Sequence, residues 1–157
     1  MASPILVLGI GNVLMGDEGV GVHAIRAFEQ EAWPPGVALL DGGTGGFHLL
    51  EYLQQYTSIV MIDATMDGQP AGTLTVLRPQ YASDYPRSLT AHDIGLRDLI
   101  EATALLGPLP DVKLVTVSIT EIRSMVLTLS ADVEAALPMV RQLVRLLLVE
   151  EMAAVDA

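Results

Sequence analysis

The chain of 157 residues is 51% apolar, carries a net charge of −11 and contains no cysteine. The acidic charge argues against binding to nucleic acid or to anionic membrane surfaces, since both need clustered lysine and arginine. The missing cysteines exclude disulfides, a cysteine nucleophile and thiolate metal sites. The length predicts one domain, residues 1–157, and no apolar run reaches the roughly 18 residues that a membrane span needs.

Strands and helices alternate along the first part of the chain. Continuous apolar runs without polar alternation indicate strands of a parallel sheet that is covered on both faces. The strands predicted in this way are 4–8, 37–40 and 58–62. Apolar residues at three- and four-residue spacing predict helices over 20–28 and 47–56, and such alternation is typical of an open α/β sheet.

The second part of the chain begins differently. The connection over 63–73 has about ten residues, which is short for a crossover that carries a helix. The alternating segment 73–77 should therefore return antiparallel, as an edge strand. Further predicted elements are a helix over 90–106, a strand over 113–119 and a helix over 130–152 in which Pro138 forms a kink or a restart. We expect a twisted, five-stranded, mostly parallel sheet with one antiparallel edge strand and helices on both faces.

The stretch 9–18 is a glycine-rich turn between the first strand and the first helix. Its Gly9-x-Gly11 resembles the start of a dinucleotide fingerprint, but Leu14 stands where the third glycine should be. The turn instead carries two acids, Asp17 and Glu18, which suit a metal ion or proton chemistry better than a phosphate. Glycines on both sides of this pair predict room for another molecule.

Acids also follow two other predicted strands. Glu18, Asp41 and Asp63 should therefore lie at one edge of the sheet, and a loop that returns to this edge could bring His92 to them. Glu18, Asp63 and His92 together would leave open positions on a divalent ion such as zinc, nickel, cobalt or manganese. Each acid also has a purely structural interpretation, as a helix N-terminal acid or as a turn former.

The remaining chemistry is less specific. His23 and His48 lie among apolar neighbours on predicted helices, so we expect them to be packed or half-exposed. No Gly-x-Ser-x-Gly elbow is present, which leaves serine proteolysis without support. A pair of acids that acts directly on water stays open.

Four motifs resemble those of the [NiFe]-hydrogenase maturation endopeptidases. They are the glycine-acid segment 9–21, Asp-Gly-Gly-Thr-Gly-Gly at 41–46, Ile-Asp-Ala at 62–64 and His-Asp-Ile-Gly-Leu at 92–96. Their order and spacing agree over almost the whole chain. The resemblance implies a three-layer α/β/α sandwich with a five-stranded sheet.

The resemblance also implies a function. It points to a cytoplasmic, aspartyl-type endopeptidase that removes a C-terminal extension from the immature [NiFe]-hydrogenase large subunit after nickel insertion. The catalytic and metal-binding roles carry over to Glu18, Asp63 and His92, with nickel supplied by the substrate and other divalent metals able to occupy the site in vitro. A role in substrate recognition carries over to Asp41, Gly42, Gly43 and Thr44. We expect a monomer.

This chain departs from the family pattern after the fifth strand. Family members often have Glu-Pro there, whereas this chain has Thr-Glu-Ile-Arg at 120–123 and a less polar loop behind it. Two alternatives to a protease stay open. One is a nickel-sensing chaperone for the same subunit without peptidase activity, and the other is a nucleotide-binding enzyme.

Overall fold

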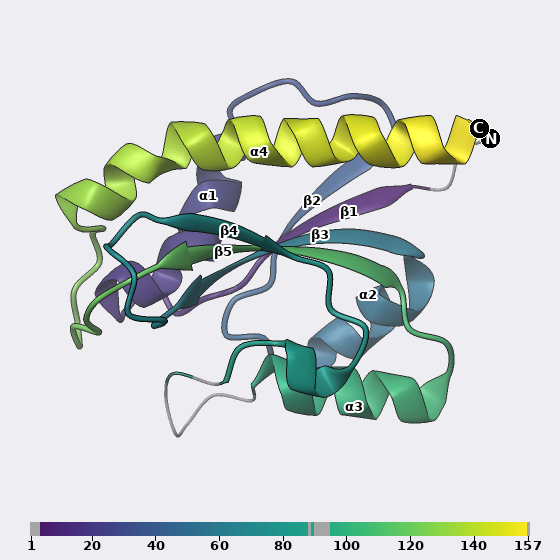
Figure 1. The fold of residues 1–157 in the computed structure, drawn as a ribbon, viewed down its shortest axis with the longest axis horizontal. Coiled ribbons are helices and arrows are strands. Elements are labelled where there is room, and N and C mark those ends of the chain that lie inside the picture. Colours follow the sequence, from purple (N-terminus) through teal and green to yellow (C-terminus); the bar gives the residue numbers. More distant parts are fainter. Residues whose placement is uncertain (1–3, 88, 90–94, 157) are drawn as a thin grey trace.

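The computed structural model describes residues 4–87, 89 and 95–156. A five-stranded sheet with strand order β2-β1-β3-β5-β4 forms its centre (Figure 1). Its strands are β1 (Ile5–Gly9), β2 (Val37–Asp41), β3 (Ser58–Thr65), β4 (Leu74–Leu77) and β5 (Asp111–Ser118). All neighbouring strands are parallel except β4, which pairs antiparallel with β5 at the sheet edge. The predicted sheet and its antiparallel edge strand are confirmed.

Helices cover both faces of this sheet, so the molecule has three layers (Figure 1). The four α-helices are α1 (Val20–Phe28), α2 (Leu50–Gln55), α3 (Leu96–Leu106) and α4 (Ala131–Asp156). Short 3-10 helices occupy Gly16–Gly19 (η1), Phe47–Leu49 (η2) and Ala82–Asp84 (η3). Helices α1 and α4 lie on one face, and α2 and α3 lie on the other.

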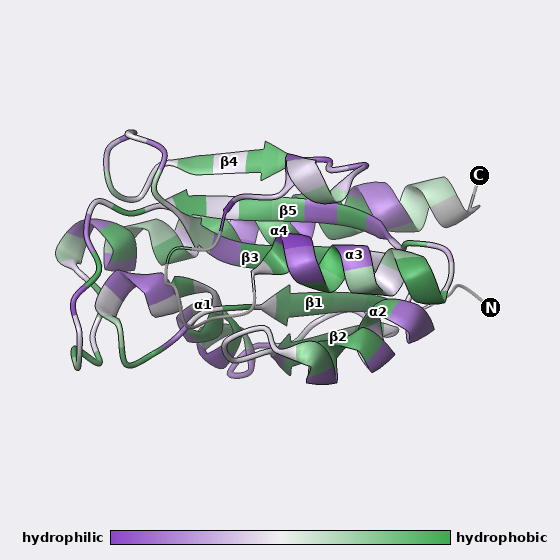
Figure 2. Cartoon of the chain, turned by 90° about the horizontal axis from the view of Figure 1, so that it is seen from below, coloured by the Kyte–Doolittle hydropathy of each residue, from purple (hydrophilic) through white to green (hydrophobic). Residues whose placement is uncertain are grey.

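Alternate residues of the central strands enter two separate cores. On β1, Ile5 and Val7 pack with α1 and α4, whereas Leu6 and Leu8 pack with α2 and α3. Successive side chains of a strand point to opposite faces, so a strand buried on both sides must be apolar throughout. Figure 2 shows β1 largely in the hydrophobic colour, whereas β5 also carries hydrophilic segments, since Lys113, Thr116 and Ser118 lie on it, and β4 at the edge alternates.

Two helices differ from the prediction. Helix α3 begins at Leu96, because Gly95 before it is extended (φ −70°, ψ 157°), so the predicted start near 90–93 is wrong. His92, the predicted imidazole of the site, lies outside the described residues. Helix α4 runs through Pro138 as one element, so the predicted restart does not occur. No helix in the described part of the chain combines the length and apolarity that crossing a bilayer would require.

The glycines of the first turn allow helix α1 to sit close against the sheet. A Cβ atom on Gly9 would overlap the carbonyl oxygen of Gly21, and one on Gly21 would overlap the carbonyl oxygens of Ile10 and Ile62. A Cβ on Gly19 would lie 2.8 Å from the Cα of Val13. Gly19 therefore leaves no room for another molecule, contrary to the prediction, because the chain's own backbone takes that space.

The two histidines on described elements differ in burial. His23 on α1 is half-buried, and its Nε2 atom is buried without a hydrogen-bond partner among the described residues. Burial, and next the charge of Arg26, lower the pKa of His23, so the neutral form is favoured. His48 on η2 is exposed. The predicted packing role therefore holds for His23 alone.

A buried ion pair lies between β5 and α4. Lys113, the single lysine of the chain, forms an ion pair with Glu151, and both residues are buried, at 6% and 7% exposure. The pair fastens the C-terminal part of α4 to the sheet. Buried charges are tolerated only when they are paired in this way, because each loses its hydration on folding.

Candidate functional site

The predicted acids lie at the edge formed by the carboxyl ends of the parallel strands. In the sheet register, Gly9 at the end of β1 is opposite Asp41 on β2 and Ile62 on β3. Asp63 is therefore beside the end of β1, and Glu18 lies on η1, which follows the turn after β1. The tertiary structure thus brings these acids to one edge, which is where open α/β sheets bind their ligands.

Glu18 is nearly enclosed, with 7% of its surface exposed. Its Oε2 atom accepts a hydrogen bond of 2.6 Å from the backbone N–H of Asn12, while the side chain of Asn12 accepts one from the N–H of Leu14. The turn therefore wraps around the carboxylate and fixes its direction. Hydrogen bonds to a charged group are short and strong, so this contact pre-organises Glu18.

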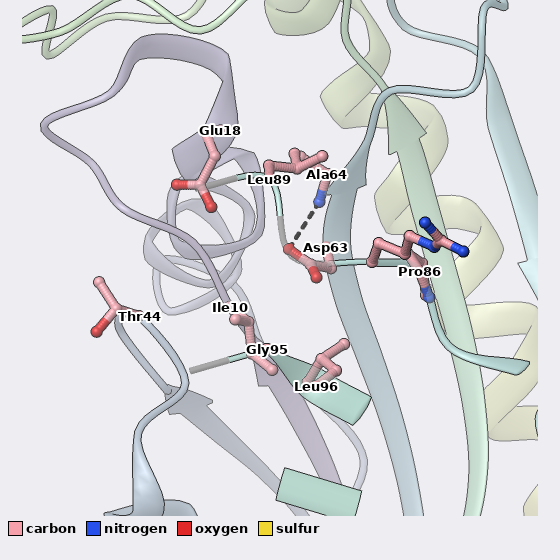
Figure 3. A pocket seen from close by; sticks show the side chains of 10 residues that line it. Ile10, Glu18, Thr44, Asp63, Ala64, Pro86, Leu89, Gly95 and Leu96 are labelled. Atoms are coloured by element: carbon pink, nitrogen blue, oxygen red, sulfur yellow. Dashed lines mark hydrogen bonds between the residues drawn. The ribbon is translucent and has the colours of Figure 1, made fainter. Parts of the chain in front are cut away.

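Asp63 is half-buried near the end of β3. Its Oδ1 atom accepts a 2.8 Å hydrogen bond from the N–H of Ala64. The carboxylates of Glu18 and Asp63 line one pocket, with Thr44 on a further side (Figure 3). The other lining residues are Ile10, Ala64, Pro86, Arg87, Leu89, Gly95 and Leu96.

The position of His92 relative to this pocket is not part of the described structure. Leu89 and Gly95, three residues before and after His92 in the sequence, both line the pocket. Within residues 4–87, 89 and 95–156, no three acidic or histidine side chains gather closely enough to hold a metal. The described chain therefore contributes two carboxylates to the pocket, which are donors that suit a hard or borderline divalent cation.

The four residues of the Asp41–Thr44 turn differ in whether they stabilise the fold or line the pocket. Asp41 is exposed, and its Oδ1 atom accepts a 2.9 Å hydrogen bond from the N–H of Gly43, so it stabilises its own turn as a structural aspartate would. A Cβ on Gly42 would lie 2.8 Å from Cδ1 of Leu8 and 3.1 Å from the carbonyl oxygen of Gly9, so this glycine sits close against the end of β1. Of the four predicted recognition residues, Thr44 alone lines the pocket.

Arg87 is a pocket residue that the sequence patterns did not identify. It lies in the loop before the His92 motif and is exposed at the pocket. The one available signal was that Arg87 is the single basic residue between 79 and 91. Arg87 is the one basic residue among the described residues that line this pocket, which otherwise carries two carboxylates.

Asp17, next to Glu18, serves the fold. It is buried, and its two carboxylate oxygens accept hydrogen bonds of 2.7 Å from the backbone N–H and the hydroxyl of Ser130. Ser130 in turn precedes α4 and accepts the N–H of Glu134 with its carbonyl oxygen. Asp17 thus fastens the start of α4 to η1, the element that carries Glu18.

Replacing Asp17 with alanine should lower the free energy of unfolding by about 1–3 kcal/mol, because the N–H and hydroxyl of Ser130 lose a buried, charged acceptor. Urea unfolding followed by circular dichroism would measure the change. Ser130→Ala should cost less, since it removes the hydroxyl alone. The two changes should be non-additive in the double variant. Additive effects would contradict a direct Asp17–Ser130 interaction.

The sequence of this chain is similar to those of several known proteins. A family model described as hydrogenase maturation protease matches residues 22–146. The hydrogenase expression/formation protein HupD of Rhodobacter capsulatus is 39% identical over 109 residues, which are 68% of this chain and 52% of HupD. The hydrogenase 2 maturation protease of Escherichia coli K12 is 36% identical over 109 residues, 68% of this chain and 66% of that protein.

The chain spans about half the length of the first curated relatives that it matches. A solved structure agrees over more of its length. The hydrogenase maturating endopeptidase HybD from E. coli superimposes with a TM-score of 0.83 at 32% identity, over 94% of this chain and 93% of HybD.

Proposed function

Because this chain belongs to the hydrogenase maturation protease family, we propose that it is an endopeptidase for the precursor of a [NiFe]-hydrogenase large subunit. The reaction is hydrolysis of one peptide bond, which releases a C-terminal extension after nickel insertion. The observation that carries the proposal is the pocket at the sheet edge, in which Glu18 and Asp63 lie together. The proposal further includes action as a monomer in the cytoplasm.

The nickel belongs to the substrate in this proposal. Glu18, Asp63 and His92 contact the metal that the precursor carries, so that only a loaded precursor places its scissile bond in the pocket. Two carboxylates in one pocket support this, and so does the sequence position of His92 between two pocket-lining residues, Leu89 and Gly95. Asp41, Gly42, Gly43 and Thr44 contact the precursor at the rim, and Thr44 lines the same pocket as the two acids.

Two routes to an activated water are compatible with this pocket. In the first, a carboxylate accepts a proton from water while the water oxygen attacks the scissile carbonyl carbon. The C–N bond then breaks, and the proton passes to the leaving amine nitrogen. In the second, the metal of the substrate polarises the water or the carbonyl as a Lewis acid. In both routes the Asn12 N–H holds Glu18 in place.

The intact mass of a large-subunit precursor, after incubation with this protein, tests the proposal. A precursor loaded with nickel should lose a C-terminal peptide, whereas the nickel-free precursor should keep it. Retained binding without a product from any candidate precursor would favour the chaperone alternative. Equal cleavage with and without nickel would leave the protease in place and remove nickel as the recognition signal.

A further inference from the structure

The loop between β5 and α4 is attached to the segment that carries Glu18. Met15 and Val126 form a parallel β-bridge, and the N–H of Gly16 donates a 2.8 Å hydrogen bond to the carbonyl oxygen of Val126. The Asp17–Ser130 contact described above fastens the end of the same loop. Figure 1 shows the loop beside the turn that precedes α1. The loop and η1 therefore form one connected surface next to the pocket.

Apolar side chains project outward from this surface. Met125 is 74% exposed, Leu127 is 60% exposed, and Leu14 on the neighbouring turn is 44% exposed. Other apolar residues of the same loop, Ile122 and Leu129, pack against the core and anchor it. The outward residues are thus held on an anchored loop, and a group of exposed large apolar side chains typically marks an interaction site.

The backbone at Met125 adds an independent observation. Its φ of 61° lies in the left-handed region, and Met125 is the one non-glycine residue with positive φ in the described parts of the chain. A side chain at positive φ costs free energy that glycine would avoid. Most of this residue's surface, 74%, is exposed. A strained residue with an outward side chain suggests a role in contact with another molecule.

We propose that Leu14, Met125 and Leu127 form a docking surface for the folded body of the precursor, next to its scissile segment. This inference rests on the proposed function. A protein whose peptide bond lies between Glu18 and Asp63 must also lie over the segment 14–18, and Leu14 is four residues before Glu18. The exposed Glu121–Arg123 ion pair on the same loop supplies a polar rim. An apolar centre with a polar rim is the usual anatomy of a protein interface.

The chemistry of the three residues indicates what the partner presents. Leucine and methionine contribute no charge or strong hydrogen bond, so the complementary area should be apolar. Methionine has flexible, polarisable side-chain atoms that adapt to irregular surfaces. A loop that contacts the body of the precursor in this way would help to determine which large-subunit precursor this protein processes.

Met125→Gly and Leu127→Ser separate docking from folding. Met125→Gly should leave the melting temperature unchanged or raise it, because it removes the left-handed strain. The KM for the nickel-loaded precursor should rise by about fivefold or more for each variant, the size expected for a residue central to an interface. Because the pocket is unaltered, kcat should change by less than about twofold. Leu146→Ser on α4, where Leu146 is 64% exposed, is the matched control and should leave KM unchanged.

Binding is measured separately, so that the docking surface and the proposed function can fail independently. The Kd for the uncleaved precursor is determined with Glu18→Gln, alone and combined with Met125→Gly. Absence of cleavage by the unaltered protein would refute the protease, while a weaker Kd in the combined variant would still support docking. Unchanged KM and Kd in the loop variants would overturn the docking surface. The docking surface would also be overturned if the variants reduced self-association of this protein in sedimentation experiments while KM stayed unchanged. The three residues would then bind a second copy of this chain and not the precursor.

Discussion

Glu18→Gln is expected to reduce processing of the nickel-loaded precursor by at least about 100-fold while the protein stays folded. A carboxylate that acts as a general base contributes roughly 100-fold or more, and glutamine can neither accept the proton nor balance the metal's charge. The fold should tolerate the change because the glutamine amide oxygen can still accept the N–H of Asn12. Precursor mass over time gives the rate, and circular dichroism checks the fold.

Two further variants make this result specific to the pocket. Asp63→Asn should show a loss of similar size, since Asp63 lines the same pocket and the asparagine oxygen can still accept the N–H of Ala64. Glu101→Gln makes the same chemical change at an exposed position on α3 and should leave the rate unchanged. Normal cleavage by Glu18→Gln would show that the assigned role of Glu18 is wrong.

The largest expected effect on stability comes from breaking the Lys113–Glu151 pair. Lys113→Ala should lower the free energy of unfolding by about 3–5 kcal/mol, because it leaves the carboxylate of Glu151 buried without its partner. Urea unfolding at neutral pH measures the loss. Lys113 lies near the start of β5, whereas the pocket lies at the carboxyl ends of the strands. The folded fraction of the variant should therefore keep its processing rate.

The double variant Lys113→Met with Glu151→Leu tests the cause of this loss. It removes both charges and keeps similar side-chain volumes, so most of the stability should return, or even exceed that of the unaltered protein. If Lys113→Ala alone costs less than about 1 kcal/mol, or if the double variant is as unstable as the single one, the buried charge is not the reason. Arg78 and Glu150, an ion pair with both side chains more than half exposed, serve as a control. Arg78→Ala should cost at most about 1 kcal/mol.

Local patterns in the sequence determined the sheet. The uninterrupted apolar runs that became β1, β2 and β3 indicated strands, and for β1 and most of β3 they reflect burial on both faces, which is a property of each segment by itself. The connection before β4 is too short to carry a crossover helix, so this strand had to return antiparallel. The placement of Glu18, Asp41 and Asp63 at one edge followed from the parallel arrangement of the strands.

Contacts between distant segments decided what each residue of the motifs does. Asp17 and Glu18 are adjacent in sequence, yet Asp17 bonds Ser130 while Glu18 lines the pocket. Gly9 and Gly21 are required by the approach of α1 to the sheet, and Arg87 reaches the pocket from a loop without a recognisable pattern. Periodicity and spacing report how one segment is buried. They do not report which remote backbone or side chain it meets, because that depends on the packing of the complete chain.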